Sequence, residues 1–143
     1  MQDPLDSKIM LVEDSDFSRA MIVTMLKKMG LQNITCPETS IEAWEMIAQA
    51  QLDDEPFDLI ITDLNMPGFD GVDLIARIKE DPMSSKQKII VVSADADDGV
   101  KSICKALGVL AYFTKPPNYE SFEEVIFAIL TDNEAIPEVR DLI

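Results

Sequence analysis

Short apolar runs that alternate with amphipathic segments are the sequence feature that most restricts the possible folds of this chain. The segments between the runs carry apolar side chains at helical spacing. This alternation is typical of a parallel sheet whose strands are connected by helices. The sequence predicts strands at residues 9–12, 34–36, 59–61, 89–92 and 111–113.

Five amphipathic segments predict five helices, four between strands and one after the last strand. Their apolar stripes lie within residues 21–29, 43–48, 74–78, 100–107 and 122–130. The methionines of the first stripe, Met21, Met25 and Met29, are interpreted as core residues. The expected N-caps of three of these helices are Ser15 or Asp16, Ser40 and Asp97.

The length and composition fit one globular domain. The chain has 143 residues, of which 47% are hydrophobic and 27% are charged, so neither a disordered chain nor a disulfide-stabilised miniprotein is expected. An excess of acidic over basic side chains gives a formal net charge of -15. Such a chain repels nucleic acid phosphates and anionic lipid headgroups, so we expect no direct nucleic acid partner.

The sequence contains no recognisable targeting or redox motif. No apolar run approaches the roughly 20 residues of a membrane span, and the amino terminus lacks the basic and apolar parts of a signal peptide. We therefore expect a cytoplasmic protein without membrane insertion. The chain has no histidine, and Cys36 and Cys104 lack metal-ligand spacing, so both are expected to be reduced, buried thiols.

Polar side chains stand where the predicted core strands end. In strand order they are Glu13 and Asp14, Asp63, Ser93 and Lys115. The carboxyl ends of parallel strands meet at one edge of a sheet, which is where ligands bind in open α/β sheets. If the strand order is 2-1-3-4-5, the first and third strands are neighbours, and the acidic pair lies beside Asp63.

This set of side chains predicts a site for metal-assisted phosphoryl transfer. Three carboxylates held close together repel one another unless a cation lies among them, and oxygen ligands favour Mg²⁺ or Mn²⁺. Lys115 and Ser93 can contact phosphoryl oxygens, and the carboxylate of Asp63 can act as a covalent acceptor. Taken alone, each residue is most simply a solvated acid, a strand-end hydroxyl or a surface lysine. The prediction therefore depends on their occurrence together at the ends of the core strands.

Four segments carry a family resemblance: KIMLVEDSDFSR, LIITDLNMPGFDG, IIVVSA and YFTKP. In order, spacing and informative residues they resemble the signature segments of a response regulator receiver domain of two-component signalling, of the type found in chemotaxis regulators. The resemblance implies an α/β fold: a flavodoxin-like, doubly wound five-stranded parallel sheet in order 2-1-3-4-5 with five helices. It covers residues 7–130 as the receiver domain and leaves 131–143 as a C-terminal extension or the start of a linker.

The resemblance also implies roles for individual residues. Asp63 would be the phosphoacceptor, which receives its phosphoryl group from a sensor histidine kinase or a histidine phosphotransfer protein in a Mg²⁺-dependent reaction. The metal ligands would be Glu13, Asp14, Asp63 and the backbone carbonyl of Asn65. Lys115 would contact the phosphoryl group, and Ser93 and Tyr112 would be the switch hydroxyl and the switch aromatic residue.

Departures from the family pattern remove no reacting group. Ser93 stands where threonine is commoner, and Glu13 stands where aspartate also occurs. The family also implies a cis peptide bond between Lys115 and Pro116. Further departures, near the second helix and after the lysine, are Ser40, Trp44 and Pro117.

The functional interpretation is a switch controlled by phosphorylation rather than an enzyme. Phosphorylation is expected to draw Ser93 toward Asp63 and to let Tyr112 turn inward. The altered surface, formed by the fourth helix, fifth strand and fifth helix, would bind an unknown downstream protein, with a phosphorylation-dependent dimer left open.

Two alternatives compete with this interpretation. A receiver-like module that binds partners without phosphorylation is one, although such modules usually lack an acidic or lysine site residue. The other is a Mg²⁺-dependent phosphohydrolase with an aspartyl-phosphate intermediate. It is disfavoured because neither the EDSD segment nor the Leu64–Asn65 pair after Asp63 fits its DxDx[TV] motif.

Overall fold

Five parallel strands form one sheet in the computed structural model, which describes residues 3–66 and 68–131. The strands are β1 (Ile9–Val12), β2 (Ile34–Thr35), β3 (Leu59–Thr62), β4 (Ile89–Ser93) and β5 (Ala111–Thr114). Their order is β2-β1-β3-β4-β5, and each neighbouring pair is parallel. The predicted fold class and strand order are confirmed. The predicted C-terminal extension lies outside the described residues from position 132 onward.

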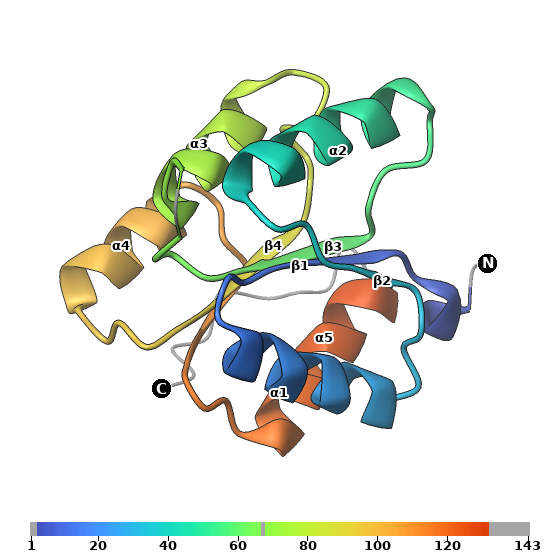
Figure 1. Cartoon of the computed structure of the whole chain (residues 1–143), viewed down its shortest axis with the longest axis vertical. Coiled ribbons are helices and arrows are strands. Elements are labelled where there is room, and N and C mark those ends of the chain that lie inside the picture. The colour runs from blue at the N-terminus through green and yellow to red at the C-terminus, as the bar shows by residue number, and fades with distance from the viewer. Residues whose placement is uncertain (1–2, 67, 132–143) are drawn as a thin grey trace.

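Helices connect the strands, as predicted. They are α1 (Asp16–Lys28), α2 (Ser40–Leu52), α3 (Gly71–Glu80), α4 (Asp98–Ala106) and α5 (Tyr119–Thr131), and a short 3-10 helix, η1 (Pro4–Asp6), precedes β1. Helices α1 and α5 cover one face of the sheet, and α2, α3 and α4 cover the other (Figure 1). Because the sheet is buried on both faces, β1, β3 and β4 are almost entirely apolar.

Two of the three expected N-caps are confirmed. Ser15 caps α1 and Asp97 caps α4, each through a side-chain oxygen that accepts a backbone N–H of the first turn. The expectation for Ser40 is wrong by one residue, because the hydroxyl of Thr39 accepts the N–H of Glu42 at 3.0 Å. Ser40 is instead the first residue of α2 and is fully buried.

The two cysteines differ in exposure. Cys104 on α4 is buried, as expected, and burial raises the pKa of its thiol. Cys36 is exposed, which corrects the expectation of a buried thiol. The physical reason is that β2 ends at Thr35, so Cys36 lies in the connection that leaves the edge of the sheet rather than in a covered strand.

The register of the sheet aligns the residues that carry the predicted chemistry. Val12 at the end of β1 pairs with Thr62 at the end of β3, so the residues that follow them emerge side by side. Ser93, the last residue of β4, pairs with Thr114, which directly precedes Lys115. Four strand ends therefore deliver their polar side chains to one edge of the sheet.

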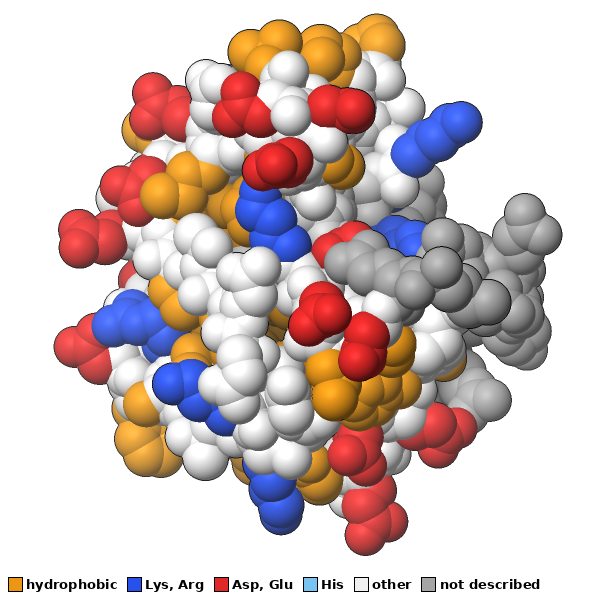
Figure 2. All heavy atoms as spheres, turned by 90° about the vertical axis from the view of Figure 1, so that its right-hand side faces the viewer, with side chains coloured by type: hydrophobic (Ala, Val, Ile, Leu, Met, Phe, Trp, Pro, Cys, Tyr) orange, Lys and Arg blue, Asp and Glu red, His pale blue; other side chains and the backbone are white. Residues whose placement is uncertain are grey.

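Acidic side chains are spread over the molecular surface. On the face shown in Figure 2, Asp and Glu side chains occupy many separate places, with Lys and Arg side chains between them. The net charge of -15 is therefore not confined to the predicted site. Within residues 3–66 and 68–131, no helix is both long enough and apolar enough to cross a membrane.

Candidate functional site

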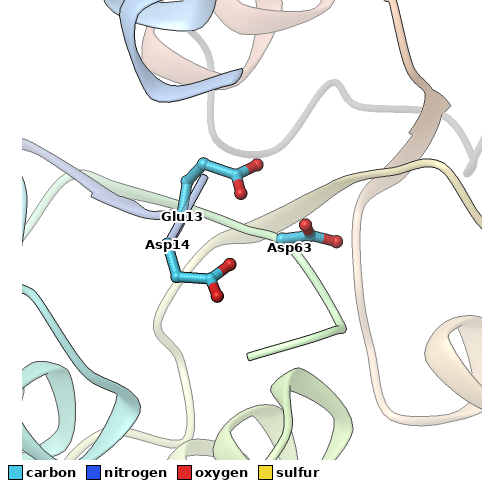
Figure 3. A group of neighbouring side chains, drawn as sticks. All are labelled: Glu13, Asp14 and Asp63. Carbon is cyan, nitrogen blue, oxygen red and sulfur yellow. The ribbon is translucent and has the colours of Figure 1, made fainter. Parts of the chain in front are cut away.

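Three carboxylates meet at the carboxyl edge of the sheet. Glu13 and Asp14 leave the end of β1, and Asp63 leaves the end of β3 beside it (Figure 3). One carboxylate oxygen from each side chain lies within 4.8 Å of those from the other two. Glu13 and Asp63 are buried and Asp14 is exposed, so the cluster reaches solvent on the side of Asp14. The structure thus brings together the acids that the sequence assigns to this edge.

Contacts from the backbone and from a lysine fix the carboxylate of Asp63. The Asp63 N–H donates to the carbonyl of Val12 at 3.0 Å, which extends the pairing of β1 and β3 by one residue. Its Oδ1 accepts the N–H of Leu64 at 2.6 Å, and its Oδ2 accepts Nζ of Lys115 at 2.8 Å. Both oxygens are therefore held in place, and 7% of the side chain remains exposed to an incoming group.

The space beside Asp63 requires glycine at position 71. Gly71 begins α3, and its N–H donates to the carbonyl of Leu64 at 2.9 Å. A Cβ at this position would overlap the carbonyl oxygen of Asp63 and lie 2.7 Å from Cα of Leu64. These are backbone atoms, which cannot turn aside as the end of a side chain can. Helix α3 therefore packs directly against the loop that carries Asp63.

Burial distinguishes Glu13 from the exposed Asp14. Its side chain is 1% exposed, and this burial raises the pKa of its carboxyl group, although Lys115 and the N–H of Ser15 oppose the shift. Its Oε2 accepts the N–H of Ser15 at 3.1 Å. Its Oε1 lies 2.6 Å from Nζ of Lys115 as an ion pair but receives no donor in hydrogen-bond geometry. This oxygen is incompletely satisfied and can face a cation.

Lys115 joins the end of β5 to the acids. Its N–H donates to the carbonyl of Ser93 at 2.9 Å, and the peptide bond that follows it is cis, as the family resemblance implies. Its Nζ donates to Asp63 and to Oγ of Ser18, at 2.8 and 3.2 Å. Burial disfavours the ammonium, but hydrogen bonds and charges from Asp63 and Glu13 outweigh it and raise the pKa of Lys115. The lysine is therefore charged at neutral pH and offsets part of the acidic charge.

Ser93 and Tyr112 are joined through the backbone of Asp95. Oγ of Ser93 accepts the N–H of Asp95 at 3.1 Å, and the hydroxyl of Tyr112 donates to the carbonyl of Asp95 at 2.6 Å. Burial raises the pKa of Tyr112 to about 12, so the hydroxyl remains a donor at neutral pH. Tyr112 is 4% exposed. It already lies inward without a phosphoryl group, whereas the sequence-based expectation has it turn inward only after phosphorylation.

The donor set fits a hard divalent cation. The cluster offers carboxylate oxygens without histidine or cysteine, one of its oxygens, on Glu13, is incompletely satisfied, and the exposed Asp14 leaves access for water. Asn65 is exposed and lies in the loop that follows Asp63. Its role as a carbonyl ligand stays a prediction.

Comparison with known proteins identifies the family. The model of the response regulator receiver domain matches residues 9–127 of the chain. The chain belongs to the response regulator receiver domain family. Chemotaxis protein CheY1 of Helicobacter pylori is 28% identical over 127 residues, which are 89% of this chain and 99% of that protein. The family indicated by the four sequence segments is thereby confirmed.

Solved receiver structures share the fold of this receiver domain. Chemotaxis response regulator CheY4 of Vibrio cholerae gives a TM-score of 0.73 at 23% identity, over 87% of this chain and 98% of that one. The receiver domain of sensor histidine kinase PA1611 from Pseudomonas aeruginosa gives a TM-score of 0.76 at 23% identity, over 89% of this chain and 99% of that one. A magnesium ion is coordinated in the active site cleft of the latter protein.

Removing Asp14 is expected to weaken Mg²⁺ binding by roughly tenfold or more, because the site loses one of three carboxylates. The affinity of Asp14→Ala for Mg²⁺ can be measured by calorimetric titration. Asp16→Ala is the matched control, since Asp16 is an exposed neighbour that pairs with Arg19 outside the acidic cluster. Equal affinities of Asp14→Ala and the unmodified chain would contradict the role of Asp14 as a ligand.

Proposed function

We propose that this receiver domain is a switch in which Asp63 accepts a phosphoryl group from a phosphohistidine donor in a Mg²⁺-dependent reaction. The donor would be a sensor histidine kinase or a histidine phosphotransfer protein. The observation that carries the proposal is the position of the Asp63 carboxylate, with the acidic pair on one side and the ammonium of Lys115 2.8 Å away. Family membership over residues 9–127 supports the same chemistry.

The proposed transfer exchanges one bond for another at phosphorus. A bond forms between a carboxylate oxygen of Asp63 and phosphorus while the bond from phosphorus to the donor imidazole nitrogen breaks. Lys115 can offset charge on the phosphoryl oxygens because its Nζ already contacts Asp63. A bound Mg²⁺ would supply further charge neutralisation and would be held by Glu13, Asp14, Asp63 and the carbonyl of Asn65. Mn²⁺ has the same ligand preference.

The proposed output begins at Asp95. The hydroxyl of Ser93 now accepts the N–H of Asp95, and a phosphoryl group on Asp63 would offer it a charged acceptor worth about 1.5–3 kcal/mol. Tyr112 is tied to the carbonyl of the same residue, so a shift of Asp95 would alter the support of Tyr112. The surface formed by α4, β5 and α5 is therefore the proposed output surface, toward a downstream protein or a second copy of the chain.

A groove between α1 and α5 supports a docking position for the donor. Its volume is about 420 Å³, and it is lined by Phe17, Ala20, Met21, Thr24, Met25, Lys28 and Tyr119. Phe17 is 81% exposed and lies at the start of α1, three residues after Asp14. We propose that an apolar helix of the donor covers Phe17, which would leave the donor histidine near the acidic cluster.

We propose residues 7–130 as the receiver domain and a cytoplasmic switch that promotes only its own phosphorylation and dephosphorylation. The family match over residues 9–127 supports these limits. The two alternatives have weaker support, because the acidic and lysine residues are all present and the sequence after Asp63 lacks the phosphohydrolase motif.

Incubation with acetyl phosphate and Mg²⁺ tests the proposed function. We expect one added phosphoryl group by intact-mass spectrometry, and we expect chelation of the metal before incubation to prevent it. The physical reason is that three carboxylates and one lysine leave the site short of the positive charge that the incoming phosphoryl group requires. No added mass in the presence of Mg²⁺, with the fold intact, would contradict the proposal.

Ser93→Ala and Tyr112→Ala are expected to keep phosphorylation at Asp63 but to weaken its effect on the output surface. Each variant removes one of the two side chains that hold Asp95. Backbone NMR shifts on phosphorylation should extend from residue 93 to 130 in the unmodified chain and stay near Asp63 in both variants. Normal spreading of the shifts in both variants would show that the signal takes another route.

A further inference from the structure

Lys115 donates a hydrogen bond to Ser18, a residue outside the acidic cluster. Its Nζ donates to Oδ2 of Asp63 at 2.8 Å and to Oγ of Ser18 at 3.2 Å, and it lies 2.6 Å from Oε1 of Glu13. Of the three N–H groups of the ammonium, one therefore donates to the acid Asp63 and one to the neutral hydroxyl of Ser18, while Glu13 contributes an ion pair. We propose that Ser18 is a positioning residue that holds Lys115 for phosphoryl transfer. This proposal rests on the proposed function of Asp63.

Ser18 differs from the other two partners because it is neutral and lies outside the acidic cluster. Glu13 and Asp63 belong to the cluster that fits a divalent cation, and Asp63 is also the proposed acceptor. The charge that these two carboxylates present to Lys115 therefore changes when a cation binds or when Asp63 is phosphorylated. The hydroxyl of Ser18 stays neutral in every state, so it can go on accepting from the ammonium when the charge on the acids changes.

The start of α1 fixes the position of Ser18. Its N–H donates to Oγ of Ser15, the N-cap, at 3.3 Å. The next residue, Arg19, donates from Nη1 to the carbonyl of Glu13 at 3.1 Å and pairs with Asp16. These contacts tie the first turn of α1 to the end of β1. Ser18 is half-buried, so its hydroxyl has a defined position relative to Lys115 rather than that of a free surface side chain.

Ser18→Ala tests the proposal by two rates, the first of them measured on the unphosphorylated, metal-free protein. We expect the ammonium protons of Lys115 to exchange with water several-fold faster than in the unmodified chain, as followed by ¹⁵N NMR. Labelling by acetyl phosphate at saturating Mg²⁺ should slow on the order of tenfold, because one hydrogen bond to a charged group is lost. Ser18→Thr keeps the hydroxyl and should restore both rates.

Ser85→Ala is the matched control, since Ser85 is an exposed serine in the turn before β4, at the opposite edge of the sheet. Both of its rates should equal those of the unmodified chain. Failure of the proposed function would appear separately, as an unmodified chain that is not labelled at all. Unchanged ammonium exchange in Ser18→Ala, or equal impairment of Ser18→Thr and Ser18→Ala, would overturn the role of Ser18.

Discussion

Replacing Asp63 with asparagine is expected to abolish labelling by acetyl phosphate in the presence of Mg²⁺. Asparagine keeps the shape of the side chain and an oxygen that can accept from Leu64 or Lys115, but an amide cannot form the acyl phosphate. The variant should therefore keep the fold and lose the reaction. Intact-mass spectrometry after incubation measures the loss, and thermal unfolding checks the fold.

Asp73→Asn is the matched control for this substitution. Asp73 also follows β3 in sequence, but it is exposed in the first turn of α3 and is not a member of the acidic cluster. We expect it to be labelled as fully as the unmodified chain. Full labelling of Asp63→Asn would mean that another side chain is the acceptor, and the proposed function would then lose its basis.

Gly71→Ala is expected to lower the free energy of unfolding by about 3 kcal/mol, at the upper end of the cost of overpacking. The added methyl group would overlap the carbonyl oxygen of Asp63 and approach Cα of Leu64 to 2.7 Å. Relief requires α3 to move away from the loop that positions Asp63, so labelling by acetyl phosphate should slow as well. Urea unfolding measures the first effect, and intact mass against time measures the second.

Gly99→Ala provides the comparison at a glycine in α4. A Cβ there meets only Oδ1 of Asp97, at 2.9 Å, the oxygen that caps α4 by accepting the N–H of Val100. Disturbing this cap costs about 1 kcal/mol, and the helix preference of alanine over glycine offsets a similar amount, so we expect the free energy of unfolding to change by less than about 1 kcal/mol. Equal stability of Gly71→Ala and the unmodified chain would contradict the close packing of α3 against Leu64.

The fold could be predicted from sequence because its signal is repeated along the whole chain. Strand and helix signals alternate along the chain, and this alternation indicates a parallel sheet. Because helices cover both faces of such a sheet, its strands are apolar throughout and are easy to recognise in the sequence. The predicted ends of β2, β3, β4 and β5 each differ from the structure by one residue. Only β2, the strand before Pro37, is shorter than predicted, so Cys36 lies outside the sheet and is exposed. A short edge strand has fewer neighbours to fix its length.

The acidic cluster could also be predicted, because it depends on topology alone. Once β1 and β3 are neighbours, the residues after Val12 and Thr62 must emerge together. The finer contacts could not be predicted. The bond from Tyr112 to the carbonyl of Asp95 and the approach of Ser18 to Lys115 depend on side-chain rotamers and loop paths. Neither has a periodic signal in the sequence.

The first helix shows where helical spacing is ambiguous. Met29 is buried in the core, as predicted, but Met21 and Met25 are only partly buried and line the groove between α1 and α5. Apolar residues at helical spacing can face either the sheet or a neighbouring helix, and the spacing alone does not distinguish the two. Phe17, in the first turn of α1, is 81% exposed although it lines the same groove.

The most direct measurement is the position of the phosphoryl group in the unmodified chain. Borohydride reduces an aspartyl phosphate to homoserine, so digestion and fragment mass spectrometry after labelling locate the acceptor at a single residue. We predict homoserine at position 63 when acetyl phosphate and Mg²⁺ are both present, and unaltered Asp63 when the metal is chelated first. Homoserine at any other position, or homoserine at position 63 even after the metal is chelated, would contradict the account.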